Sequence, residues 1–125
     1  MSPMAMILAD QDMEDLAAYF SSQTPRPTGE TEPSKLQRGQ SIYRAGIASK
    51  GVPSCAGCHG PSGRGIAGAA FPMIGGQHAV YAATQLRSYK SGARATDPNS
   101  MMRTIASRLT DDEIDAVASY LQGMR

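Results

Sequence analysis

The residues best suited to carry chemistry are five in a row, Cys55-Ala56-Gly57-Cys58-His59. Two thiols at this spacing can form thioether bonds with the two vinyl groups of a haem, which ties one porphyrin edge to the chain. The histidine that follows would then lie beneath the ring with an imidazole nitrogen facing the iron. The motif therefore predicts one covalently bound haem c, attached through Cys55 and Cys58, with His59 as an iron ligand.

A haem iron that transfers electrons usually has a second axial ligand, because six-coordinate iron reorganises little between its oxidation states. A methionine thioether can serve, and it favours the reduced state relative to a second histidine. Of the eight methionines in the chain, Met101 and Met102 follow the glycine-rich stretch on a short predicted helix. We predict that one of these two methionines is the distal ligand.

Other interpretations of the same residues are less consistent with the rest of the chain. A redox-active dithiol needs a neighbouring βαβ unit, and the sequence contains no convincing strand. A zinc site needs two further ligands, and His78, which we expect at a helix start on the surface, is the only other histidine. Residues 63–68 match the dinucleotide-binding string G-x-G-x-x-G but follow no strand, so we expect a loop against the porphyrin.

Apolar periodicity predicts helices over about 33–45, 77–90 and 110–121, and a shorter one that begins at Asp97-Pro98. Thr110 and Glu113 form a capping-box pattern, Pro33 suits a first helical turn, and Gly92 ends the 77–90 helix. We expect Val80, Ala83 and Leu86 to face inward. Residues 51–76 are rich in glycine and proline, which predicts a loop wrapped around a bound group.

The chain contains an internal repeat, in which residues 1–20 align with residues 102–121. Asp10 falls on Asp111, and Met13, Leu16 and Phe20 fall on apolar positions of the later helix. We therefore expect residues 1–20 to be the closing helix of a preceding domain, 21–33 to be a linker, and 34–125 to form the domain with the Cys-x-x-Cys-His motif. The chain would then be a fragment, and the exposed apolar face of its first helix suggests a homodimer.

Charge and hydropathy narrow the classes of partner. The 125 residues include 12 Lys and Arg against 11 Asp and Glu, so we expect no nucleic-acid partner. No stretch approaches the roughly 20 apolar residues of a transmembrane helix. The first residues do not form a secretory signal, although covalent haem attachment in bacteria takes place outside the cytoplasm, so we expect a periplasmic protein whose signal lies outside this chain.

At these residues the chain resembles the class I cytochromes c, and most closely the cytochrome c4 family of two-haem proteins. The likeness covers nearly the whole chain, through Gly39 and Tyr43 and through residues 51–65, 71–94, 97–109 and the final helix to Tyr120. It implies a mainly α, class I cytochrome c fold, with helices packed around one haem. It also implies that Gly39 lets two helices cross closely and that the Tyr43 ring packs near Tyr120.

The resemblance also implies roles for individual residues around the iron. His59 would be the proximal ligand, and the distal methionine would come from residues 97–109. Met102 is preferred because the repeat aligns it with Met1, and Met101 is the alternative. The family further suggests that the Pro61 carbonyl accepts the outer N–H of the histidine. Pro72 would pack near that histidine, and Arg94 is a candidate for binding a haem propionate.

The function we predict is one-electron transfer between redox protein partners, such as respiratory complexes or a terminal oxidase, with no bond made on a substrate. One rival is a haem domain cut from a larger oxidase or dehydrogenase. Another is a sensor or enzyme with an open iron site, in which Met102 is not bound.

Overall fold

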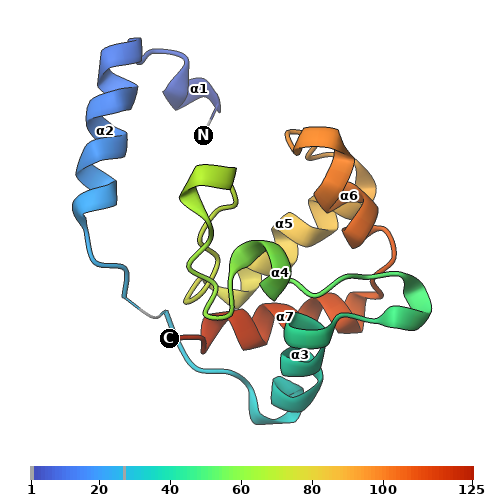
Figure 1. Cartoon of the computed structure of the whole chain (residues 1–125). Helices are drawn as coiled ribbons and strands as arrows, with labels where there is room; N and C mark the ends of the chain where they lie inside the picture. Colours follow the sequence, from blue (N-terminus) through green and yellow to red (C-terminus); the bar gives the residue numbers. More distant parts are fainter. Residues whose placement is uncertain (1, 27) are drawn as a thin grey trace.

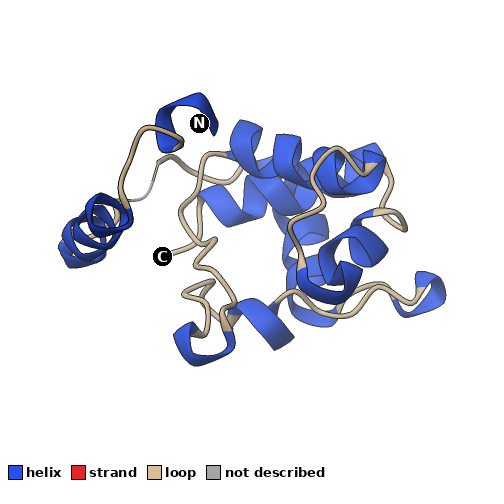
Figure 2. Cartoon of the chain, turned by 90° about the horizontal axis from the view of Figure 1, so that it is seen from above, coloured by secondary structure: helices blue, strands red, loops and turns tan. Residues whose placement is uncertain are grey.

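The computed structural model describes residues 2–26 and 28–125, and it is built from helices and connecting loops (Figures 1 and 2). Within those residues the only β pairing consists of two isolated bridges, Ile47 with Val52 and Ile66 with Phe71. The mainly α class predicted from the sequence is therefore confirmed. The helices are α1 (Ser2–Ala5), α2 (Asp10–Ser22), α3 (Pro33–Ala45), α4 (Ala56–His59), α5 (Ala79–Ser91), α6 (Met101–Ala106) and α7 (Asp111–Gln122), with single 3₁₀ turns at Ala48–Lys50, Ala67–Ala69 and Pro98–Ser100.

The predicted helix ends agree well with the observed ones. Pro33 is the first residue of α3, Gly92 ends α5 in the left-handed conformation, and the Thr110 side chain accepts a hydrogen bond from the Glu113 amide at the start of α7. Two expectations need correction. The stretch 51–76 contains the short helix α4, and the N-terminal segment forms two helices within residues 2–22, α1 and α2, with a break at residues 6–9.

The core is organised by α7, which packs against both α3 and α5. In Figure 1, α7 runs across the lower part of the molecule, with α3 below it and α5 above it. Its apolar stripe, including Ile114 and Val117, is buried, and Ile42 and Tyr43 of α3 are fully buried. The Tyr43 and Tyr120 rings lie 5.6 Å apart between centroids. This confirms the packing expected of Tyr43.

Gly39 is the contact point of α3 with α7. A methyl group at this position would collide with the Ala116 carbonyl oxygen and with Cβ of Tyr120. The close helix crossing predicted at Gly39 is therefore confirmed, and it depends on the absence of a side chain there.

The inward face predicted for α5 is only partly correct. Ala83 is buried and Leu86 is half-buried, but Val80 is 81% exposed. Val80 lies in the first turn of α5 and lines a groove between α5, α7 and residues 30–35. The three-residue spacing predicted that Val80 faces inward, but α7 and its neighbours do not cover its side chain.

A buried carboxylate joins three segments of the domain. The Glu113 side chain, 7% exposed, forms ion pairs with Lys50 and Arg38, both at 2.7 Å, and accepts the backbone N–H of Thr110. Burial opposes its charged form, but the hydrogen bonds from Lys50, Thr110 and Arg38 lower the pKa of Glu113 to about 2. The capping box predicted at this residue is present, and it is part of a larger ionic network that the sequence did not reveal.

The helix α2 stands apart from the helices of residues 33–125 in both views (Figures 1 and 2). None of the residues of α2 is buried, and Met13, Leu16, Tyr19 and Phe20 are all more than 40% exposed. The segment that follows α2 is bound to the domain at its far end. Thr28 donates to the Gly76 carbonyl, and the Glu32 amide donates to Ser119 Oγ. In the described part of the chain, no helix is long and apolar enough to cross a bilayer.

The crossing at Gly39 generates a stability prediction. Gly39→Ala should lower the free energy of unfolding by about 2 kcal/mol, because the added methyl group overlaps backbone atoms of α7 that cannot move aside. Gly68→Ala is the matched control, since no atom lies within 4 Å of a methyl group there. Denaturant unfolding of the haem-loaded protein measures both variants. Equal stabilities for the two would contradict the assigned role of Gly39.

The Glu113 network generates a pH-dependent prediction. Because the folded-state pKa is lowered from 4.5 to about 2, the ionised Glu113 stabilises the fold above about pH 4.5, and this contribution is lost as the pH falls toward 2. At pH 7, Glu113→Gln should lower the free energy of unfolding by about 2 kcal/mol.

The difference between wild type and Glu113→Gln should shrink when unfolding is measured at pH 3. Asp111→Asn is the control, because Asp111 makes a surface ion pair with Lys90 and is 67% exposed. Its effect should be small at either pH. A Glu113→Gln difference that is the same at pH 7 and pH 3 would show that charge is not the cause.

Candidate haem-binding site

The Cys-x-x-Cys-His motif folds as one helical turn. Cys55 precedes α4, Cys58 lies one turn later, and His59 is the last residue of the helix. The His59 amide donates to the Cys55 carbonyl at 2.9 Å, which fixes the relative positions of the two ends of the motif. Both cysteines are free thiols and half-buried, while His59 is only 8% exposed.

The His59 ring is oriented by a backbone carbonyl. Nδ1 lies 2.9 Å from the carbonyl oxygen of Pro72. Since a carbonyl can only accept, Nδ1 carries the proton in this hydrogen bond, and the lone pair of Nε2 is left for a metal. This contact agrees with the prediction that Pro72 lies near the histidine. The prediction that the Pro61 carbonyl accepts this N–H is wrong. Pro61 is exposed in the turn directly after His59, and the carbonyl that faces Nδ1 belongs to Pro72.

The loop that brings Pro72 to His59 is braced by its own backbone. The Gly65 amide donates to the His59 carbonyl at 2.8 Å, and the amides of Ile74 and Gly75 donate to the Gly63 carbonyl at 2.8 and 2.9 Å. Gly65 has a φ of +75°, and a methyl group there would collide with the Phe71 carbonyl oxygen. The glycines of residues 60–76 therefore allow the chain to fold back on itself beside the imidazole.

Burial raises the pKa of two side chains at the motif. Burial, together with a smaller effect of the nearby Cys58, raises the pKa of the Cys55 thiol to about 11. Burial likewise raises the pKa of Tyr43 to about 12, with Cys55 as a second cause. The Tyr43 hydroxyl donates to the carbonyl of Gly60, the residue after His59. Sequence reasoning placed Tyr43 in a helix contact and missed this hydrogen bond, for which the sequence carries no signal.

The two candidate distal ligands begin α6. Met101 is 39% exposed and Met102 is half-buried, and α6 packs against α5. The two residues before them, Asn99 and Ser100, both have left-handed backbone conformations, with φ of +53° and +57°. Such conformations are uncommon for residues other than glycine. The methionines therefore follow directly on a strained turn.

Arg94 lies beyond the end of α5. Its guanidinium donates to Gln85 Oε1 at 2.7 Å and lies 4.6 Å from the centroid of the Tyr89 ring. These contacts hold Arg94 against α5, and its binding to a propionate stays a prediction.

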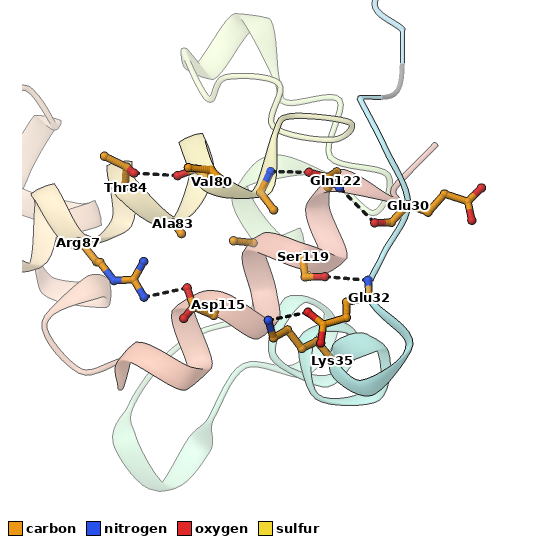
Figure 3. Close-up of a pocket in the computed structure, with 12 residues that line it drawn as sticks. Glu30, Glu32, Lys35, Val80, Ala83, Thr84, Arg87, Asp115, Ser119 and Gln122 are labelled. Carbon is orange, nitrogen blue, oxygen red and sulfur yellow. Dashed lines mark hydrogen bonds and ion pairs between the residues drawn. The ribbon is translucent and has the colours of Figure 1, made fainter.

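A separate groove of about 540 Å³ lies between α5, α7 and residues 30–35 (Figure 3). Its polar groups bond to one another: Arg87 pairs with Asp115, and Gln122 bridges the Ala79 amide and the Glu30 carbonyl. None of the predicted site residues lines this groove. Among residues 2–26 and 28–125, no group of three His, Cys, Asp or Glu side chains is arranged to hold a metal ion.

The arrangement fits a covalently bound haem. It provides two free thiols one helical turn apart, a buried imidazole with one nitrogen bonded to a carbonyl, and a glycine-rich loop that closes beside the imidazole.

Comparison with known proteins agrees with this geometry. Residues 36–125 match the family Cytochrome c. The chain therefore belongs to the cytochrome c family, and its cofactor is haem c.

Within that family the chain is similar to cytochrome c4. It is 49% identical to cytochrome c4 of Thiocapsa roseopersicina, over 99% of this chain and 65% of the relative. A crystal structure of reduced recombinant cytochrome c4 from Pseudomonas stutzeri superposes with a TM-score of 0.94 and 43% identity, covering 98% of this chain and 64% of that one. The mainly α, class I cytochrome fold predicted from the sequence is confirmed.

A second group of relatives has a different name. The chain is 38% identical to a thiosulfate dehydrogenase electron acceptor of Stutzerimonas stutzeri, over 96% of this chain and 56% of that protein. The chain thus spans less than two thirds of the length of these relatives.

Proposed function

We propose that this domain is a one-electron carrier, with haem c attached through Cys55 and Cys58 and ligated by His59. The observation that carries the proposal is the hydrogen bond from His59 Nδ1 to the Pro72 carbonyl, which leaves Nε2 of a buried imidazole free to bind iron. When bound, haem supplies an iron that cycles between the ferrous and ferric states. The protein holds the proximal imidazole in one tautomer and one orientation and limits the access of water to it.

Met102 is the distal ligand in this proposal. Two observations support Met102 over Met101: the internal repeat aligns it with Met1, and its side chain is the less exposed of the two. A neutral imidazole and a thioether change little between the two oxidation states, which suits electron transfer and not bond making. No substrate step is therefore assigned to this domain, and Arg94 is retained as a candidate for binding a propionate.

The partners we propose are other redox proteins of a respiratory chain, in the periplasm. Support comes from relatives that are named as cytochromes c4 and from one named as an electron acceptor of thiosulfate dehydrogenase. That second name makes a dehydrogenase the alternative donor, in which case the domain would serve an enzyme without itself being one.

Residues 1–20, which include most of α2, are proposed to be the C-terminal end of a preceding cytochrome domain, joined by residues 21–33 to the domain of residues 34–125. The repeat equates Met13, Leu16 and Phe20 of α2 with Ile114, Val117 and Leu121 of α7. The α7 residues are at most 4% exposed, whereas their α2 counterparts are 41–66% exposed. The same apolar pattern is thus buried in α7 and exposed in α2. This difference supports the proposal that the apolar face of α2 packs against the rest of a preceding domain. A homodimer through α2 is the alternative.

Covalent attachment is tested first by mass. Expressed with working haem-ligation machinery, the wild type should carry one haem after denaturation, and the variant with both Cys55→Ala and Cys58→Ala should have the mass of the bare polypeptide. Each single variant should keep one thioether bond and show a shifted pyridine haemochrome band. Ser54→Ala is the neighbouring control. A colourless wild-type protein would refute the proposal.

The axial ligand is tested by electrochemistry. Met102→Ala should lower the reduction potential by on the order of 100 mV, because loss of the thioether disfavours the reduced state and axial ligands tune haem potentials over about 0.8 V. Met101→Ala should leave the potential nearly unchanged. The reverse result would identify Met101 as the distal iron ligand. If neither variant changes the potential and the wild type binds carbon monoxide at once, the iron site is open.

A further inference from the structure

The turn before the two methionines is strained and needs an external restraint. Asn99 and Ser100 are consecutive non-glycine residues with left-handed backbones. Such a conformation costs free energy at each residue and persists only where surrounding contacts impose it. The first two residues of α6, Met101 and Met102, follow immediately, so any relaxation of this turn moves them.

The helix α6 also lacks a cap of its own. Ser100 occupies the N-cap position, but its side chain makes no capping hydrogen bond. The backbone N–H of Arg103, in the first turn of α6, instead donates to a side chain that precedes Ser100 in the chain. Oδ2 of Asp97 accepts the backbone N–H of Arg103 at 3.0 Å, and Oδ1 accepts Nε–H of the same residue at 2.8 Å. The Asp97 carboxylate therefore replaces the missing cap and spans the strained turn.

The restraint is built into the interior. The Asp97 side chain is 3% exposed and that of Arg103 is 35% exposed. Burial opposes the charge of Asp97, but the hydrogen bonds from Arg103 keep its pKa below the ordinary value. The other end of α6 is held differently, because Ala106 is fully buried and the helix packs against α5. The end that carries the methionines is thus held by the Asp97–Arg103 contact.

We infer that Asp97 is a positioning residue for the distal methionine, acting through Arg103 to hold the first turn of α6. This inference rests on the proposed function, in which a methionine of α6 is an iron ligand. A neutral thioether is a weak ligand for ferric iron, so it competes with added ligands only if it is held in place beforehand. Loosening the turn should therefore make the distal position easier to occupy, without loss of the haem.

The test is the rate at which imidazole replaces the distal ligand in the ferric haem-loaded protein. Asp97→Ala should raise this rate about fivefold to tenfold, the effect of losing one helix cap of ordinary strength. Asp97→Asn keeps one acceptor oxygen and should give a smaller increase. The control Asp111→Asn also removes a charge paired with a cation, but at the start of α7, and it should stay within about twofold of wild type.

The ferric thioether–iron absorption band provides a second readout. It should weaken in Asp97→Ala and be retained in Asp111→Asn. Unchanged imidazole rates and an unchanged band in both Asp97 variants would overturn the inference.

Arg103→Leu keeps the test decisive if the Asp97 variants do not fold. It removes the Nε contact while the backbone N–H remains, and it should speed imidazole binding by a smaller factor. A wild-type rate in Arg103→Leu would then overturn the inference.

Failure of the inference is distinguishable from failure of the proposed function. If Met102→Ala or Met101→Ala abolishes the thioether–iron band but the Asp97 variants behave like wild type, the methionine ligand stands and the role of Asp97 fails. If neither methionine variant changes the band, the methionine ligand of the proposed function fails, and the inference fails with it.

Discussion

The site depends on one hydrogen bond, from Nδ1 of His59 to the carbonyl oxygen of Pro72. This hydrogen bond selects the tautomer of the buried imidazole and fixes the rotation of the ring about its Cβ–Cγ bond. It also explains the loop between the two residues. For a backbone carbonyl thirteen positions away to face the ring, the chain must reverse direction, and glycines with positive φ at 60, 63 and 65 permit the reversal. The amides of the loop then bond to its own carbonyls, and these hydrogen bonds hold the loop in the shape that presents the carbonyl of Pro72 to the ring.

The helices form the frame on which that loop is mounted. Tyr43 connects the two, because its ring packs against Tyr120 of α7 while its hydroxyl donates to Gly60 beside the histidine. At the other end of the interface, Glu113 ties α7 to α3 and to the turn that leads into the motif. The crossing of α3 and α7 is therefore fixed by a missing side chain at Gly39, an aromatic pair and a buried ion pair.

Much of this could be predicted from the sequence, for identifiable reasons. Helix ends are set by local chemistry, so Pro33, Gly92 and the Thr110–Glu113 capping box marked them correctly. The Cys-x-x-Cys-His motif is contiguous, so its own geometry is local as well. The errors concern contacts between distant residues. The sequence does not say which carbonyl the loop will bring to His59, whether α7 and its neighbours cover Val80, or that Lys50 and Arg38 converge on Glu113. Each of these depends on tertiary placement, which periodicity does not encode.

The two copies of the repeated helix separate local from tertiary effects in one chain. Both α2 and α7 begin with a carboxylate that bonds back to the N-cap amide, Asp12 in the first and Glu113 in the second. Local sequence therefore suffices to start each helix. Only α7 is packed, and a 13-residue helix without a buried face is marginal in water. The apolar stripe of α2 cannot contribute to its stability until something covers it. Helix formation in α2 and the burial of Met13, Leu16 and Phe20 are therefore coupled, so a partner that supplied surfaces like those of α3 and α5 would stabilise both together.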